Sequence, residues 1–213
     1  MRKLFFTFAF YLTVAYSFAQ IESGKQIYSA PGLDQLLSSA KTVAILPFKV
    51  SISYKKMPKG MTIEAVKENE KQESLQMQQG MYTYLLRKAD DFTVTFQDVD
   101  RTNALLKKAG LLENLDDVMA DSLCSILKVD AIIKSNWSYA KTGSEAGAIA
   151  SAMLLGVGKG TGSGQLVMQI NGAKDGALAW RMSKEMNEGV FSSANELMER
   201  MMRKVGRVFP FEK

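Results

Sequence analysis

Apolar residues recur along this chain with two different spacings, one typical of strands and one typical of helices. These spacings predict the order of the secondary-structure elements. Thr42–Val50 is a continuous apolar run rich in β-branched residues, which predicts a strand covered on both faces. Pro47 has no N–H to donate to a ladder, so we expect it at a bulge or near the strand end. Phe92–Phe96 and Ala131–Trp137 are predicted to be two further strands.

Helical periodicity occupies the segments between these strands. The highly charged stretch 51–74 predicts an exposed loop or a solvated helix start. From Leu75 the pattern becomes amphipathic, with Leu75, Tyr82, Leu85 and Leu86 on one predicted apolar face. Further helices are expected over 100–106, begun by an aspartate cap, and over Leu115–Leu127. Strands separated by helices imply parallel pairing through right-handed crossovers.

The last third of the chain has an antiparallel pattern. Residues 165–171 and 178–182 alternate apolar and polar positions, and the turn-rich hexapeptide 171–176 joins them. This arrangement predicts a β-hairpin with one buried face. Ser193 and Glu196 form a capping box, and the helix that follows carries an apolar stripe that we expect to close the core.

The predicted fold class is α/β, with one domain over residues 20–213. We expect a mixed sheet of about five strands, parallel in its first part and ending in an antiparallel hairpin, with helices flanking it. Residues 143–164 are rich in glycine and are interpreted as a connector between the parallel part and the hairpin. No internal repeat and no second domain is predicted.

The first 19 residues have the pattern of a cleavable export signal. A short basic segment at positions 2 and 3 precedes the apolar stretch Leu4–Ala15, which is too short to span a bilayer comfortably. Ser17 and Ala19 are small residues at the two positions that a signal peptidase reads, so cleavage is expected before Gln20.

The position of the single cysteine bears on how the mature protein is held. Cys124 lies far from the expected cleavage site, where a bacterial lipoprotein would need a cysteine for acylation. We therefore expect a periplasmic or secreted protein without a lipid anchor. Alone, Cys124 cannot form an internal disulfide, and its apolar helical surroundings predict a buried, inert thiol.

Charge and composition exclude several classes of function. The net charge is +5, spread along the chain without the dense basic stripe that nucleic-acid binding requires. The 213 residues contain no histidine, which rules out Ser-His-Asp triads, Cys-His pairs and histidine-ligated metal sites. The sequence therefore predicts no catalytic, cofactor-binding or metal-binding set, and no cofactor.

Paired carboxylates leave one enzymatic alternative open. Asp98 and Asp100 lie two positions apart, and a hydrolase of unfamiliar type could use such a pair if both side chains converged on a pocket. Helix capping and pairing with a helix dipole explain the same residues without catalysis. The two explanations differ in the side-chain direction that they predict. A hydrolase needs both carboxylates to point into a pocket, and side chains that point into solvent would exclude it.

Five short segments occur in a particular order: VAILPF (43–48), LLKKAG (105–110), LKVDAIIKSNW (127–137), DGALAW (175–180) and VFPF (208–211). Together they resemble the superfamily that contains the TolB amino-terminal domain and the curli assembly/transport component family, including lipoproteins that activate penicillin-binding proteins. The resemblance covers most of the expected mature chain.

The resemblance implies an α/β envelope domain that binds proteins, in secretion or wall assembly, and performs no chemistry. The sequence departs from the family pattern at Lys128, where relatives carry glycine, and in lacking the lipidation cysteine.

We therefore expect a non-enzymatic accessory or scaffold protein of envelope assembly, whose partners are other envelope proteins or a second copy of itself, with at most peripheral membrane contact. The predicted contact surfaces are the exposed face of the sheet edge and the small apolar stretch 146–155. The residues of that stretch expected to touch a partner are Ala146, Ile149, Met153, Leu154 and Leu155.

Overall fold

A computed structural model describes residues 25–141, 162–188 and 194–213. These residues form one α/β domain whose sheet has seven strands in the order β1-β7-β6-β5-β2-β4, with β3 also paired to β5. The strands are β1 (Gln26–Ser29), β2 (Thr42–Ile45), β3 (Lys49–Tyr54), β4 (Thr95–Phe96), β5 (Ala131–Lys141), β6 (Gly162–Gly172) and β7 (Leu178–Glu188). The helices are α2 (Leu33–Ser39), α3 (Ile63–Leu86), α4 (Val99–Lys108), α5 (Ala120–Leu127) and α7 (Ala194–Val205), and three short 3₁₀ turns are η1 (Ala89–Asp91), η2 (Leu115–Asp117) and η3 (Gly206–Val208).

The predicted fold class is confirmed, and the pairing follows the predicted division of the chain. β2, β3 and β4 belong to the parallel part, in which β5 pairs with both β2 and β3. From β5 onward the sheet is antiparallel through β6, β7 and β1. The predicted number of about five strands was too low, because β1 and β3 were not expected as separate strands.

The apolar run predicted as one strand is divided at its proline. Pro47 lies in the break between β2 and β3, and the Leu46 N–H still donates to the Ile133 carbonyl at 3.0 Å. Both faces of β2 are covered, as the run of apolar residues predicted. Val43 and Ile45 belong to one core cluster, whereas Ala44 and Leu46 belong to the other.

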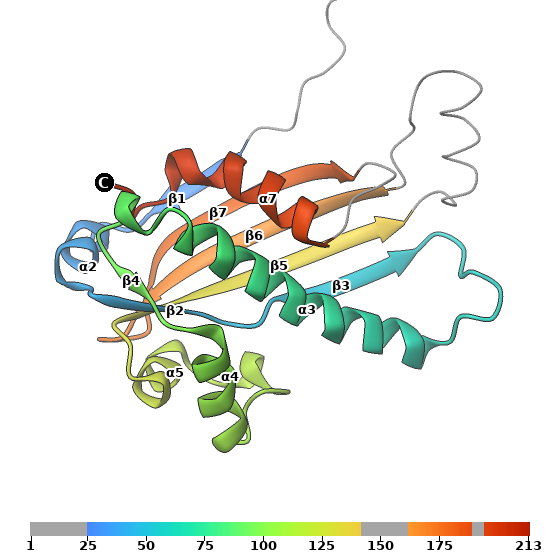
Figure 1. The fold of residues 1–213 in the computed structure, drawn as a ribbon, viewed down its shortest axis with the longest axis horizontal. Helices are drawn as coiled ribbons and strands as arrows, with labels where there is room; N and C mark the ends of the chain where they lie inside the picture. Colours follow the sequence, from blue (N-terminus) through green and yellow to red (C-terminus); the bar gives the residue numbers. More distant parts are fainter. Residues whose placement is uncertain (1–24, 142–161, 189–193) are drawn as a thin grey trace, which may run out of the picture.

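Helices pack on both faces of the sheet, but on one face they cover only β2 and the start of β5. Figure 1 shows α3 and α7 lying across one face, with α4 and α5 grouped near β2 and β4. The larger core cluster lies under α3 and α7 and includes Trp137, Trp180 and Met201. The smaller cluster packs α4 and α5 against β2 and the start of β5, through Leu106 and Leu123.

Helix α3 differs from its prediction in length and in its buried face. It begins at Ile63, capped by the Thr62 hydroxyl, which accepts the Ala65 N–H at 3.2 Å. Its buried residues include Met77, Met81 and the predicted Leu85, whereas the predicted Leu75 and Leu86 are exposed. The predicted apolar face of α3 therefore coincides only in part with the buried one.

The segments around the predicted connector lie partly outside the described residues. Residues 143–161 and the capping Ser193 cannot be compared with their predictions for this reason. The last three residues of the predicted connector, 162–164, belong to β6.

Lys128 adopts an uncommon backbone conformation. It ends α5 with φ 58° and ψ 52°, and it is the one non-glycine residue of positive φ among those described. Left-handed backbone at the end of a helix favours glycine, because a Cβ is crowded there. The position that is glycine in the family pattern is therefore a left-handed helix end in this chain.

Replacing Lys128 by glycine is expected to stabilise the protein by about 1 kcal/mol, since the substitution removes the crowded Cβ at this left-handed position. Thermal unfolding followed by circular dichroism measures the change. Lys107→Gly, within the right-handed α4, should lower the melting temperature instead. A Lys128→Gly protein no more stable than the parent would contradict this interpretation.

Candidate functional site

From Ser135 to Tyr139, strand β5 alternates between a buried face and an exposed one. Trp137 and Tyr139 point into the core under α3, with their rings stacked at a centroid distance of 6.1 Å. Asn136 and Ser138, which precede each of them in turn, are exposed on the opposite face. Because side chains alternate along a strand, the residues directly opposite them on the neighbouring strands lie on the same face.

The strand register aligns these polar residues into rows. Ser138 is opposite Ser51 of β3 and Gln165 of β6, and Gln165 is opposite Glu185 of β7. The rows on either side repeat the arrangement. We name this surface the open face, and it consists of Lys49, Ser51, Ser53, Asn136, Ser138, Ala140, Ser163, Gln165, Val167, Ser183 and Glu185.

The open face is shallow and hydroxyl-rich. A hollow of about 360 Å³ lies on it, lined by Ser51, Ser138 and Gln165 together with their neighbours. Across it, Gln165 Nε2 donates to Ser183 Oγ at 3.2 Å, and at its border Lys49 forms an ion pair with Asp116. It lies on the side of the sheet opposite to α3 and α7, so it is behind the strands in Figure 1.

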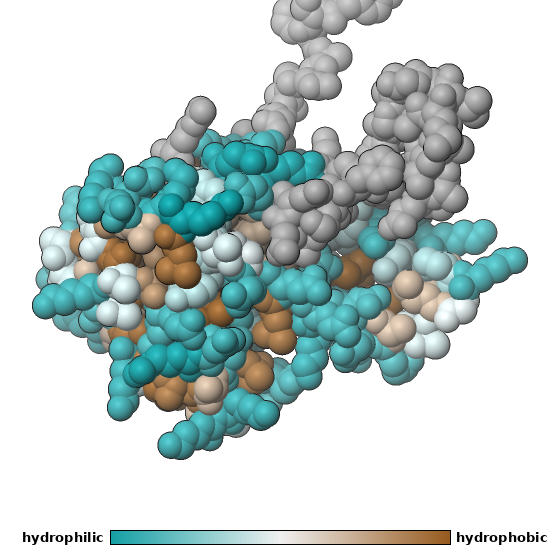
Figure 2. Space-filling view, in the orientation of Figure 1, coloured by the Kyte–Doolittle hydropathy of each residue, from teal (hydrophilic) through white to brown (hydrophobic). Residues whose placement is uncertain are grey.

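The side covered by α3 and α7 is visible in Figure 2. Hydrophilic side chains cover most of that side, and apolar side chains are confined to separate small groups. Long charged side chains of α3 and α7 form ion pairs there, such as Arg87 with Glu199. The open face, by contrast, carries mostly short uncharged side chains.

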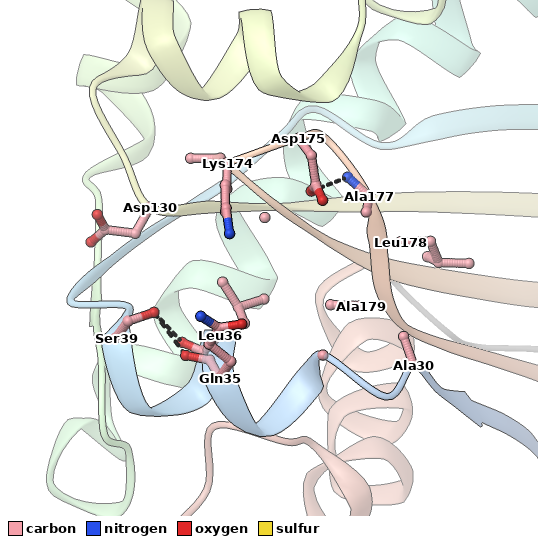
Figure 3. A pocket seen from close by; sticks show the side chains of 13 residues that line it. Ala30, Gln35, Leu36, Ser39, Asp130, Lys174, Asp175, Ala177, Leu178 and Ala179 are labelled. Atoms are coloured by element: carbon pink, nitrogen blue, oxygen red, sulfur yellow. Dashed lines mark hydrogen bonds between the residues drawn. The ribbon is translucent and has the colours of Figure 1, made fainter.

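A second hollow, of about 460 Å³, lies between α2 and the turn that joins β6 to β7. Leu36 lines its apolar part, and Figure 3 shows the Lys174 side chain directed toward α2. The two nearby carboxylates have structural roles. Asp130 Oδ2 accepts the N–H groups of Lys41 and Thr42 at 2.8 and 2.9 Å, and Asp175 Oδ1 accepts an N–H within its own turn at 2.9 Å. These bonds stabilise the turn and the start of β2.

The carboxylate pair of the hydrolase alternative does not converge on a pocket. Asp98 caps α4, accepting the Arg101 N–H at 3.0 Å, and Asp98 and Asp100 both lie at the surface of the first turn of that helix. Burial and the neighbouring Asp98 carboxylate raise the pKa of the Tyr82 hydroxyl above its usual value. Asp98 therefore has the capping role, and the structure gives the hydrolase alternative no support.

Cys124 is buried, as its sequence pattern predicted. It is 1% exposed beside Leu123 and Leu127 in the smaller core cluster. Burial, and then the Asp121 and Asp130 carboxylates, raise the pKa of its thiol to about 12. Because the thiolate is the reactive form, this thiol is inert near neutral pH.

In residues 25–141, 162–188 and 194–213, no three His, Cys, Asp or Glu side chains lie close enough together to hold a metal ion. No helix within those ranges has the length and apolar character that a membrane span requires.

The structure describes the open face but not the predicted contact residues. Ala146, Ile149, Met153, Leu154 and Leu155 all lie outside the described residues, so their role stays a prediction. The open face was missed in part, because Ser51 and Ser53 were placed in a loop. The signal was present in the alternation of residues 50–54, where small polar side chains separate Val50, Ile52 and Tyr54.

No family profile and no curated protein sequence matches the chain. Among solved structures, it is similar to the lipoprotein GNA1162 from Neisseria meningitidis, with a TM-score of 0.45 and 11% identity over 78% of this chain and 96% of that one. It is similar to the PelC dodecamer from Paraburkholderia phytofirmans, with a TM-score of 0.42 and 13% identity over 89% of this chain and 96% of that one. The LpoB C-terminal domain from Salmonella enterica has a TM-score of 0.35 and 13% identity, over 74% and 94% of the two chains. At these scores the likeness transfers no function to this chain.

Proposed function

We propose that this protein is a non-enzymatic, exported periplasmic protein that serves as an accessory or scaffold in envelope assembly or secretion. It acts by protein–protein contact through the open face. Export is expected from the signal pattern of residues 1–19, and the mature chain is expected to carry no lipid. The absence of histidine and the buried thiol leave few groups for chemistry.

The observation that carries the proposal is the composition of the open face. Seven of its eleven residues are serine, asparagine or glutamine, and its charges are confined to Lys49 and Glu185, on the outer strands β3 and β7. Burying a long charged side chain costs up to about 2 kcal/mol in rotamer entropy, whereas short side chains cost much less. Burying a surface of this kind against a partner therefore costs little side-chain entropy.

The size of the open face indicates how far a partner must extend. Strands lie about 4.8 Å apart and rise about 3.3 Å per residue, so four strands with three rows of side chains cover roughly 300 Å². A stable interface buries about 800 Å² on each partner. A partner must therefore cover more than the open face. The next row of paired residues extends this surface, and it consists of Lys134, Gln169, Arg181 and Tyr28 of the edge strand β1.

Replacing Ser138 by arginine is expected to abolish partner capture by placing a long charged side chain at the middle of the open face. The measurement is co-purification of envelope proteins with the exported chain after mild crosslinking in cells. The matched control is Ser125→Arg, at an exposed serine of α5 outside the open face. We expect at least a tenfold loss of captured protein for Ser138→Arg, which corresponds to about 1.4 kcal/mol of binding.

The two variants should have the same melting temperature as the parent, because both side chains point to solvent. If the two serine variants lose capture equally, or if neither loses it, contact through the open face is excluded. If no envelope protein is captured by the parent chain, the proposed function itself is wrong.

A further inference from the structure

Among the described residues, the loop between β3 and α3, residues 55–62, forms the outermost part of one end of the structure. It protrudes at the right-hand end of the long axis in Figure 1, beyond the ends of β3 and β5. Its sequence is KKMPKGMT, which contains three lysines and two methionines and no acidic residue. We name these residues together with Ile63 the tip.

Both ends of the tip are fixed by hydrogen bonds. The Lys55 N–H donates to the Lys141 carbonyl at 3.0 Å, which continues the β3–β5 ladder by one step. At the other end the Thr62 hydroxyl caps α3. Between them the Met61 N–H donates to the Pro58 carbonyl at 3.2 Å, and Gly60 supplies the positive φ of 81° that the turn requires. The side chains of the tip are therefore presented on a defined turn.

The tip combines positive charge with exposed apolar side chains. Lys55, Lys56 and Lys59 are all exposed, and none of them forms an ion pair with a carboxylate of the described residues. Met57 is 43% exposed and Ile63 is 64% exposed, which is high for apolar side chains of their size. Figure 2 shows pale and tan atoms among teal ones at this end of the molecule.

We infer that the tip docks the protein on the surface of an anionic phospholipid bilayer. Its lysines would contact the negatively charged headgroups, while Met57 and Ile63 would enter the boundary with the acyl chains. The inference is independent of the open face and of the proposed function.

The shape of the tip favours a membrane over an acidic protein as the partner. A single convex turn cannot supply the 800 Å² or so that each partner contributes to a stable protein interface. A bilayer surface accommodates a small protrusion, and apolar side chains between lysines are suited to its interface. The nearest acidic residue along the chain, Glu64, lies in the first turn of α3, where the helix dipole favours a negative charge.

The experiment is co-sedimentation of the exported protein with vesicles of phosphatidylglycerol and phosphatidylcholine, compared with vesicles of phosphatidylcholine alone. Each lysine near an anionic surface contributes about fivefold to the partition coefficient. The variant K55Q/K56Q/K59Q should therefore bind the anionic vesicles on the order of a hundredfold more weakly. The matched control, K41Q/K107Q/K108Q, removes the same charge from exposed lysines elsewhere and should bind within about threefold of the parent.

A second variant tests the apolar part of the tip. Met57→Ser combined with Ile63→Ser should weaken binding several-fold while leaving its dependence on salt unchanged. The two triple variants differ from each other only at the six substituted lysines, so any contact through the rest of the chain is common to both. Equal binding by the two triple variants would overturn the inference, as would equal binding to anionic and neutral vesicles or no binding at all. Selective capture of the tip by an acidic protein without vesicle binding would also overturn it.

Discussion

Replacing Phe209 by alanine is expected to lower the free energy of unfolding by about 4 kcal/mol, the cost of removing a large aromatic side chain from a packed core. Phe209 is 3% exposed and lies at the centre of an aromatic cluster. Its ring centroid is 5.8 Å from that of Phe92, 6.1 Å from that of Trp180 and 6.0 Å from that of Phe211. Alanine would leave a cavity that several elements share.

The position of Phe209 in the chain adds to the expected effect. The residues that follow it hold the C-terminal end against the segment before β4. The Phe211 carbonyl accepts the Thr93 N–H at 2.9 Å, and the Lys213 N–H donates to the Asp91 carbonyl at 2.8 Å. Losing the aromatic anchor should loosen these bonds as well.

Urea unfolding measures the Phe209→Ala effect, and Leu86→Ala is the matched control. Leu86 is also a large apolar residue but is 49% exposed, so its removal should cost less than about 1 kcal/mol. A difference of less than about 1 kcal/mol between the two variants would contradict the description of the core.

Replacing Gly164 by alanine is expected to destabilise the protein by about 3 kcal/mol, although the substitution adds only one methyl group. The added Cβ would overlap the six-membered ring of Trp137, which is fully buried and stacked on Tyr139. Neither side chain has room to move, because both belong to the larger core cluster beneath α3 and α7.

Gly32→Ala is the control for this effect, since a Cβ at Gly32 meets no atom within 4 Å and its φ is −86°. It should change stability by at most about 0.5 kcal/mol. Thermal unfolding with tryptophan fluorescence suits both variants, because Trp137 reports its own packing. Gly164→Ala unfolding at the temperature of Gly32→Ala would show that the ring can be displaced at little cost.

Gly164 also illustrates what the sequence could and could not predict. The glycine-rich composition of 143–164 was interpreted as a connector, because composition does not distinguish a glycine of a loop from one that a neighbouring ring requires. The contact depends on Trp137, which lies far away in the chain and reaches Gly164 only through the β5–β6 register, where Tyr139 is opposite Gly164. A local sequence pattern does not predict a contact between residues that are so far apart in the chain.

The buried parallel strands, unlike the Gly164 contact, were predictable from the local sequence. Thr42–Ile45 and the start of β5 are continuous apolar runs because helices cover both of their faces, so burial alone identified them. The open side of the sheet has polar residues at every second position, which weakens the apolar signal of β3 and β1. The candidate surface was therefore the part of the fold that the sequence defined least.

The open face and the tip are separate surfaces of the molecule. The open face comprises side chains that point away from α3, whereas the tip continues β3 into α3. A protein held at a bilayer by the tip would keep the open face available to a partner. The two surfaces can therefore be tested by separate variants.

Photo-crosslinking in living cells tests the central claim of contact through the open face most directly. A photoreactive amino acid is placed at Ser138 or Gln165, and at Ser125 of α5 and Lys107 of α4 as controls. The account predicts one discrete adduct with an envelope protein from the first two positions and none from the controls. Adducts only from the control positions, or none from any position, would contradict it.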